Sequence, residues 1–80
     1  MWTVYVLRCA DGTHYVGMTG DMERRLSEHR RGLNRWTRTR LPVELVHQEQ
    51  LPTRVAARAR EKALKSGWSK RRLVARLGLR

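Results

Sequence analysis

Five side chains in this 80-residue sequence are of types that could carry chemistry: Tyr5, Tyr15, Arg25, His29 and Glu61. Arg25 and His29 are four residues apart, so on a helix they would share one face. Phenol and imidazole groups can carry a proton, and a guanidinium can stabilise charge that develops on a phosphate. A carboxylate is a suitable ligand for a hard divalent cation. These five positions are therefore candidates for an active site.

Each of these residues also has an ordinary structural explanation. A tyrosine in a strand is usually a core residue whose hydroxyl has one partner. Gly17 could mark a strand bulge. Glu61 could form a salt bridge with Arg58 or Lys65 on its own helix. The ordered series, rather than any single residue, therefore carries the prediction.

The first half of the chain is expected to hold the elements that position these groups. Residues 2–9 are β-branched and aromatic, with apolar side chains at both alternating sets of positions. This pattern predicts a central strand that is covered on both faces. Asp11-Gly12 predicts a hairpin turn into a second strand from His14 to Met18. A helix is expected from Asp21 to about Arg31, ended by Gly32.

The second half predicts one more strand and two helices. Residues 43–50 alternate, with Val43 and Leu45 on one face and His47 a candidate third. A helix from Thr53 to Gly67 would bury its small apolar side chains, which are Val55, Ala56, Ala59 and Ala63. A short third helix would follow a Ser69 cap. The expected fold is α+β, in the order β-β-α-β-α-α, with a three-stranded antiparallel sheet flanked by three helices in one domain over residues 1–80.

The turn decides whether the two tyrosines can share a site. In a plain two-residue turn over Asp11-Gly12, Tyr15 would pair with Arg8, and the tyrosines would lie on opposite faces of the sheet. A shared site requires an odd-length loop or a bulge, such as a three-residue turn with Gly12 left-handed. We expect one of these.

The charge predicts a nucleic-acid partner. Eighteen Lys and Arg oppose seven Asp and Glu, for a net charge of +11. Guanidinium groups bind phosphate through two parallel hydrogen bonds. Codon usage in a GC-rich genome is the alternative explanation. Within a loop over residues 33–43, side chains that could grip phosphates or stack on a base are Arg35, Trp36, Arg38 and Arg40. In the alternative, this loop is solvated and Trp36 folds into the core.

The remaining composition excludes several classes of protein. The single Cys9 rules out an internal disulfide and a Cys-rich zinc site, and it fits a reducing cytoplasm. No apolar run approaches the roughly 20 residues that would span a bilayer. No signal-peptide pattern opens the chain. We expect a cytoplasmic protein without a membrane partner.

The ordered series resembles the GIY-YIG nuclease family, and in particular its short, stand-alone bacterial branch of uncharacterised proteins. The first motif corresponds to Val4-Tyr5-Val6 and the second to Tyr15-Val16-Gly17. Further matching segments are Leu7-Arg8-Cys9-Ala10-Asp11-Gly12, Glu23-Arg24-Arg25-Leu26, Glu28-His29, Pro42 and Arg60-Glu61-Lys62. The likeness covers nearly the whole chain.

This resemblance implies an endonuclease that hydrolyses phosphodiester bonds in DNA with Mg²⁺ or Mn²⁺, in DNA repair or recombination. Glu61 would hold the metal ion, and Arg25 would face the scissile phosphate. Tyr5 would be the general base, while Tyr15 and His29 would position the water or relay its proton. The pattern departs from the family at Val4, which replaces a glycine. It also departs in lacking a late asparagine, because the only Asn is Asn34, in another region.

Two alternatives remain open from the sequence. The chain could be a nucleic-acid binding module without activity, although binding alone does not require Glu61. It could also be a nuclease subunit directed by a partner protein, or act as a homodimer. The sequence leaves open whether the substrate is single-stranded, duplex or branched DNA, or RNA.

Overall fold

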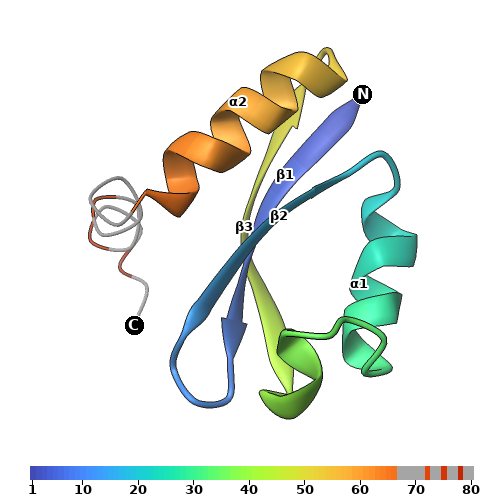
Figure 1. Ribbon diagram of the computed structural model, residues 1–80, viewed down its shortest axis with the longest axis vertical. Coiled ribbons are helices and arrows are strands. Elements are labelled where there is room, and N and C mark those ends of the chain that lie inside the picture. The colour runs from blue at the N-terminus through green and yellow to red at the C-terminus, as the bar shows by residue number, and fades with distance from the viewer. Residues whose placement is uncertain (67–71, 73–74, 76–77, 79–80) are drawn as a thin grey trace.

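A computed structural model describes residues 1–66, 72, 75 and 78 of the chain. Its elements are β1 (Trp2–Cys9), β2 (His14–Thr19), α1 (Met22–Arg30), a 3₁₀ turn η1 (Thr37–Thr39), β3 (Val43–Leu51) and α2 (Arg54–Lys65). The three strands form one antiparallel sheet in the order β2-β1-β3. Figure 1 shows α1 and α2 on either side of this sheet. The predicted α+β order is confirmed through α2; the third helix predicted from Ser69 lies outside the described residues.

The β1–β2 hairpin has the shifted register that a shared site requires. The backbone amide of Cys9 donates to the carbonyl of Thr13 at 2.8 Å, which leaves a three-residue loop whose last member, Gly12, has a φ of 86°. Tyr5 therefore pairs with Gly17, and Leu7 pairs with Tyr15. Residues directly opposite, and those two further along a strand, point to the same face. Both tyrosines thus lie on one face, as expected.

Strand β1 is buried on both faces, as its sequence predicts. On the α1 face, Tyr5, Leu7 and Cys9 form a core cluster with Val43, against which the partly buried Met22 and Leu26 of α1 pack. On the α2 face, the cluster consists of Val4, Val6, Val16, Ala57 and Leu64. The central strand thus separates two small cores, one under each helix.

The pairing of β3 with β1 contains an irregularity that the alternating sequence conceals. Leu7 pairs with Leu45, but Val6 pairs with His47, so Val46 is an extra residue on β3. Such a bulge shifts the alternation of side chains by one. Val43 and Leu45 accordingly pack in the α1-side cluster, whereas Val46 packs in the α2-side cluster. The expectation that His47 shares a face with Val43 and Leu45 is wrong for this reason.

Both helices begin at the predicted caps. The side chain of Asp21 accepts a hydrogen bond from the Arg24 amide at 3.1 Å, and that of Thr53 accepts one from the Ala56 amide at 3.1 Å. These caps satisfy amides that the first turn leaves without a helical partner. Gly32, with a φ of 78°, follows α1 as expected.

The buried side of α2 differs from the predicted one. Val55 is 81% exposed, and Ala59 and Ala63 are also exposed. Ala57 and Leu64 are the buried residues of the helix. Leu64 has more apolar surface to remove from water than an alanine has, so its burial sets the rotation of α2. This rotation turns the partly buried Glu61 toward the sheet rather than away from it.

No helix among the described residues is both long and apolar enough to cross a bilayer.

Candidate active site

The centre of the candidate site lies on the α1 face of the hairpin, where Gly17 leaves room for two tyrosine rings. A Cβ atom on Gly17 would lie 2.5 Å from the Tyr5 hydroxyl oxygen and 3.0 Å from Cε1 of Tyr15. The ring centroids of the two tyrosines are 6.3 Å apart. Gly17 is therefore required because the tyrosine rings occupy the space that a side chain would fill. It pairs regularly with Tyr5, so it does not mark the bulge considered from the sequence.

A Gly17→Ala substitution is expected to displace the Tyr5 hydroxyl, because the new methyl group would overlap it. Overpacking of this kind costs about 1–3 kcal/mol of stability, and a displacement of about 1 Å at a reacting group can lower a rate about 100-fold. Thermal unfolding and a cleavage assay measure the two effects.

Gly20→Ala is the matched control for stability, since its Cβ would meet only Trp2, at 3.8 Å. If Gly17→Ala unfolded at the same temperature as Gly20→Ala and cleaved at the wild-type rate, the close approach of Tyr5 to Gly17 would have no importance for stability or activity.

Helix α1 brings Arg25 and His29 to the Tyr5 hydroxyl. The hydroxyl oxygen lies 2.9 Å from Nε2 of His29 and accepts a hydrogen bond from Nε of Arg25 at 3.4 Å. The His29 side chain is fully buried, and its ring lies 5.0 Å from that of Tyr15, centroid to centroid. The structure thus brings together Tyr5, Tyr15, Arg25 and His29, and Arg25 and His29 share one helix face as their spacing predicted.

Burial keeps the side chains of Tyr5 and His29 neutral. Loss of solvent raises the pKa of the Tyr5 phenol to about 12, and the hydrogen bond from Arg25 opposes that rise only in part. Burial, together with the positive charge of Arg25, lowers the pKa of His29 to about 4. Near neutral pH, Tyr5 therefore holds its proton and His29 has a free nitrogen lone pair.

Glu28 holds Arg25 from the other side. Its Oε1 accepts a hydrogen bond from Nη1 of Arg25 at 3.0 Å, and its Oε2 lies 3.4 Å from Nε of Arg24. Burial alone would lower the pKa of Arg25, but its hydrogen bonds to Tyr5 and Glu28 outweigh this and raise that pKa. The guanidinium of Arg25 is therefore charged and held by two partners.

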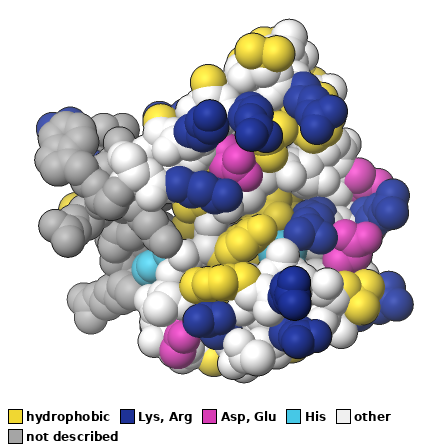
Figure 2. Space-filling model, viewed as in Figure 1, with side chains coloured by type: hydrophobic (Ala, Val, Ile, Leu, Met, Phe, Trp, Pro, Cys, Tyr) yellow, Lys and Arg dark blue, Asp and Glu magenta, His cyan; other side chains and the backbone are white. Residues whose placement is uncertain are grey.

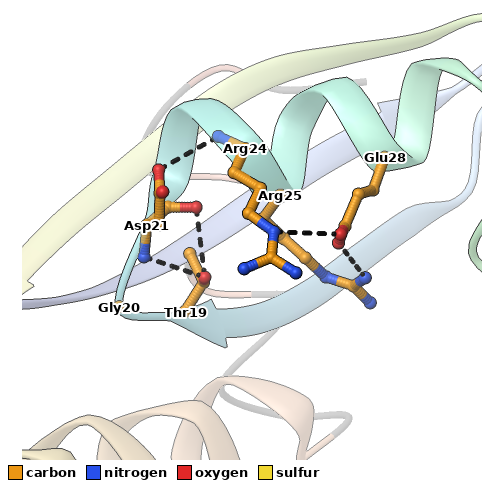
Figure 3. Close-up of a pocket in the computed structure, with 6 residues that line it drawn as sticks. All are labelled: Thr19, Gly20, Asp21, Arg24, Arg25 and Glu28. Carbon is orange, nitrogen blue, oxygen red and sulfur yellow. Dashed lines mark hydrogen bonds and ion pairs between the residues drawn. The ribbon is translucent and has the colours of Figure 1, made fainter.

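An open cavity of about 260 Å³ lies beside this arginine. Figure 3 shows the side chains of Arg24 and Arg25 reaching toward the carboxylate of Glu28. The cavity is also lined by residues at the start of the helix, which are Thr19, Gly20 and Asp21. The cavity thus gives a ligand access to the guanidinium of Arg25.

Glu61 approaches this group of residues from α2. Figures 1 and 3 show α2 across the edge strand β2 from α1. The Glu61 side chain is 16% exposed, and its Oε2 lies 3.6 Å from Nζ of Lys65. This is the ion pair considered from the sequence. The charge of Glu61 also contributes to the raised pKa of Tyr5, so the carboxylate acts on the site electrostatically.

The ligand set suits only a loosely held metal ion. Among the described residues, no group of three or more His, Cys, Asp and Glu side chains could hold a metal. Glu61 alone offers one hard carboxylate ligand. Mg²⁺ commonly binds through one or two carboxylates while it keeps several waters and contacts substrate phosphates. The residues present therefore fit a hydrated divalent ion shared with a phosphate, and they do not form a closed cage.

In the basic loop, Arg40 packs against Trp36. The Arg40 guanidinium lies 3.9 Å from the centroid of the Trp36 ring, and its Nη1 donates to the Trp36 carbonyl. Nε of Arg40 also lies 3.4 Å from Oδ2 of Asp11 in the hairpin loop. The Trp36 ring, which is 39% exposed, lies 5.6 Å from the Tyr15 ring. Trp36 is thus outside the core, and Arg40 covers one face of its ring. Arg35 and Arg38 are exposed.

Sequence reasoning missed Asn34 and Thr37 as members of the site. The fully buried hydroxyl of Thr37 lies 2.9 Å from Nδ1 of His29. Nδ2 of Asn34 donates to the Tyr15 hydroxyl at 3.4 Å. An asparagine that accepts hydrogen bonds from the amides two and three residues later is a common turn, so the spacing of Asn34 and Thr37 was the available signal.

The surface around the site is predominantly basic. Figure 2 shows Lys and Arg side chains over α2 and over α1, with hydrophobic side chains between them. Such an arrangement favours an anionic polymer that lies across β2.

Comparison with known proteins identifies the family. The model of the GIY-YIG catalytic domain matches residues 1–73. The chain therefore belongs to the GIY-YIG family of nuclease domains.

Its relatives within that family are UPF0213 proteins. The chain is 51% identical to one from Natronomonas pharaonis over 75 residues, covering 90% of this chain and 88% of the relative. It is 46% identical to one from Desulfotalea psychrophila over 77 residues, covering 91% and 70%. The solution NMR structure of a UPF0213 protein from Bacillus halodurans matches with a TM-score of 0.60 at 37% identity, covering 94% of this chain and 84% of that one.

Proposed function

We propose that this protein is an endonuclease that hydrolyses phosphodiester bonds in DNA with the help of Mg²⁺ or Mn²⁺. The observation that carries the proposal is the buried Tyr5 hydroxyl, held between Nε2 of His29 and Nε of Arg25. A purely structural tyrosine needs one partner for its hydroxyl. This one lies between a nitrogen that can accept its proton and a cation that opposes the rise in its pKa, and both would help Tyr5 to act as a general base.

The side chains have separate roles in the proposed reaction. The phenol of Tyr5 gives its proton to Nε2 of His29 and takes a proton from the attacking water. The water thereby becomes hydroxide as its oxygen attacks phosphorus. The bond to the 3′ oxygen then breaks, that oxygen takes up a proton from solvent, and His29 releases the proton it received, which restores the starting state. Arg25 stabilises the charge that develops on the phosphate, and Tyr15 orients the water. A divalent ion held by Glu61 would supply positive charge at the phosphate and leaving oxygens.

The nucleic-acid contacts belong to the same proposal, with one change from the sequence-based expectation. Exposed Arg35 and Arg38 are free to reach backbone phosphates. Because Arg40 already covers Trp36, a base would stack on the planar guanidinium of Arg40 rather than directly on the indole.

The direct test incubates the purified protein with single-stranded, duplex, nicked and branched DNA and with RNA. Each substrate is tested with Mg²⁺, with Mn²⁺ and with excess EDTA. We expect cleavage of at least one DNA in the presence of metal and none in EDTA, because one carboxylate holds the ion weakly. Binding of every substrate without cleavage would favour a silent binding module. Cleavage that appears only with a copurified protein would favour a directed subunit.

A further inference from the structure

A chain of hydrogen bonds continues from His29 into the basic loop. Nδ1 of His29 lies 2.9 Å from the hydroxyl of Thr37, and this hydroxyl lies 3.2 Å from Oδ1 of Asn34. The orientation of the Asn34 amide is determined by its backbone partners. Its Oδ1 accepts hydrogen bonds from the amides of Trp36 and Thr37, both at 2.9 Å. This atom must therefore be oxygen, which cannot donate.

The position of the proton follows from the loop end of this chain. The hydroxyl of Thr37 has one hydrogen, which it donates to Oδ1 of Asn34. The hydroxyl can then only accept from His29. Nδ1 of His29 must carry its hydrogen, and Nε2 must be the bare nitrogen.

The Tyr5 end of the chain gives the same result independently. The Tyr5 hydroxyl oxygen already accepts a hydrogen bond from Arg25. If Nε2 of His29 also donated to it, the phenolic hydrogen would have no acceptor among these contacts, although Tyr5 is only 1% exposed. An unsatisfied buried donor costs about 1–3 kcal/mol. With Nε2 bare, the phenol donates to it and every group is satisfied.

We propose that Thr37 and Asn34 are positioning residues that hold His29 in the Nδ1–H tautomer, so that Nε2 is poised to take the phenolic proton of Tyr5. The catalytic consequence rests on the function proposed above, but the tautomer does not. The same Asn34 amide also donates to the Tyr15 hydroxyl at 3.4 Å. One side chain of the basic loop therefore connects both tyrosines of the site.

The test observes the tautomer by long-range ¹H–¹⁵N correlation NMR near pH 7.5, where His29 is neutral. The chain has three histidines, so His14→Gln and His47→Gln assign the His29 signals. The wild type should show Nδ1–H at His29. An Nε2–H signal in the wild type would overturn the proposal, and this measurement needs no variant that must fold.

Thr37→Val and Thr37→Ser form a matched pair. Valine keeps the shape of threonine without its hydroxyl, whereas serine keeps the hydroxyl. In Thr37→Val part of the His29 population should change to Nε2–H, because a buried Nδ1–H would lose its acceptor while the Tyr5 hydroxyl still favours a bare Nε2. In Thr37→Ser the tautomer should not change. An unchanged tautomer in folded Thr37→Val would overturn the role of Thr37. Asn34→Asp, which keeps the accepting oxygen, should leave the tautomer of His29 unchanged, and an Nε2–H signal there would contradict the role of Oδ1.

Activity separates this inference from the proposed function. In the cleavage assay, Thr37→Val should lower kcat at least about tenfold with little change in KM, because Nε2 of His29 cannot accept the proton in the other tautomer. Thr37→Ser should keep the wild-type kcat. If the wild type shows the Nδ1–H tautomer but cuts no substrate, the inference about His29 stands and the proposed function fails. Full activity in Thr37→Val with a changed tautomer would overturn the catalytic role of this positioning.

Discussion

Glu61→Gln is expected to lower kcat for DNA cleavage by at least about 100-fold while DNA binding stays close to that of the wild type. The amide keeps the size of the side chain but removes the negative charge that would hold a divalent ion. Charge stabilisation by a bound metal contributes several kcal/mol to a transition state, and each 1.36 kcal/mol corresponds to about tenfold in rate. Single-turnover cleavage and binding to labelled DNA, both in Mg²⁺, measure the two properties.

The fold should tolerate this change. Glu61→Gln removes one ion pair, to a Lys65 side chain that is 53% exposed. Exposed pairs of this kind contribute at most about 1 kcal/mol. Glu23→Gln is the matched control, because Glu23 is an exposed acid in the first turn of α1, and it should cleave normally. Cleavage that survives in Glu61→Gln would mean that a contaminant is responsible, or that a metal binds elsewhere.

Tyr5→Phe is expected to have the second large effect, a loss of at least about 100-fold in kcat with the fold retained. The substitution removes one oxygen and keeps the ring that packs with Leu7 and Val43. It removes the proposed general base, a type of group that contributes about 100- to 10,000-fold. Single-turnover cleavage at saturating DNA measures this loss.

The stability of Tyr5→Phe should fall moderately, because Nε2 of His29 and Nε of Arg25 each lose a partner. Leaving such a buried group unsatisfied costs about 1–3 kcal/mol. Thermal unfolding followed by circular dichroism measures the loss and shows that the variant is folded at the assay temperature. A folded Tyr5→Phe variant that cuts at the wild-type rate would exclude the phenol as the base.

Most of the fold is predictable from the sequence because its determinants are local. Asp21 and Thr53 cap their helices with side chains that reach amides three residues away. Residues 2–9 have apolar side chains on both faces, and this pattern identifies the central strand without knowledge of where the helices lie. Strand parity is also local, so the need for an odd-length turn or a bulge before Tyr15 follows from residue positions alone, and the structure has the three-residue turn.

Contacts between distant segments were not predictable in the same way. The bulge at Val46 depends on how β3 meets β1, and it places His47 on the α2 face. The rotation of α2 depends on the burial of Leu64 against the sheet, and the row of alanines gives no sign of it. A periodic pattern shows which side of a helix is more apolar, but the largest side chain decides which side packs.

The candidate site divides along the same line. By itself, the sequence determined that Tyr5, Tyr15, Arg25 and His29 could meet, because a short hairpin and the following helix bring close neighbours together. Only the tertiary structure decided what surrounds them. Thr37 and Asn34 acquire their partners when the basic loop closes over His29, and Arg40 covers Trp36 where that loop meets the hairpin turn. Hydrogen bonds in a loop depend on the three-dimensional path of the chain, and no periodic pattern in the sequence encodes that path.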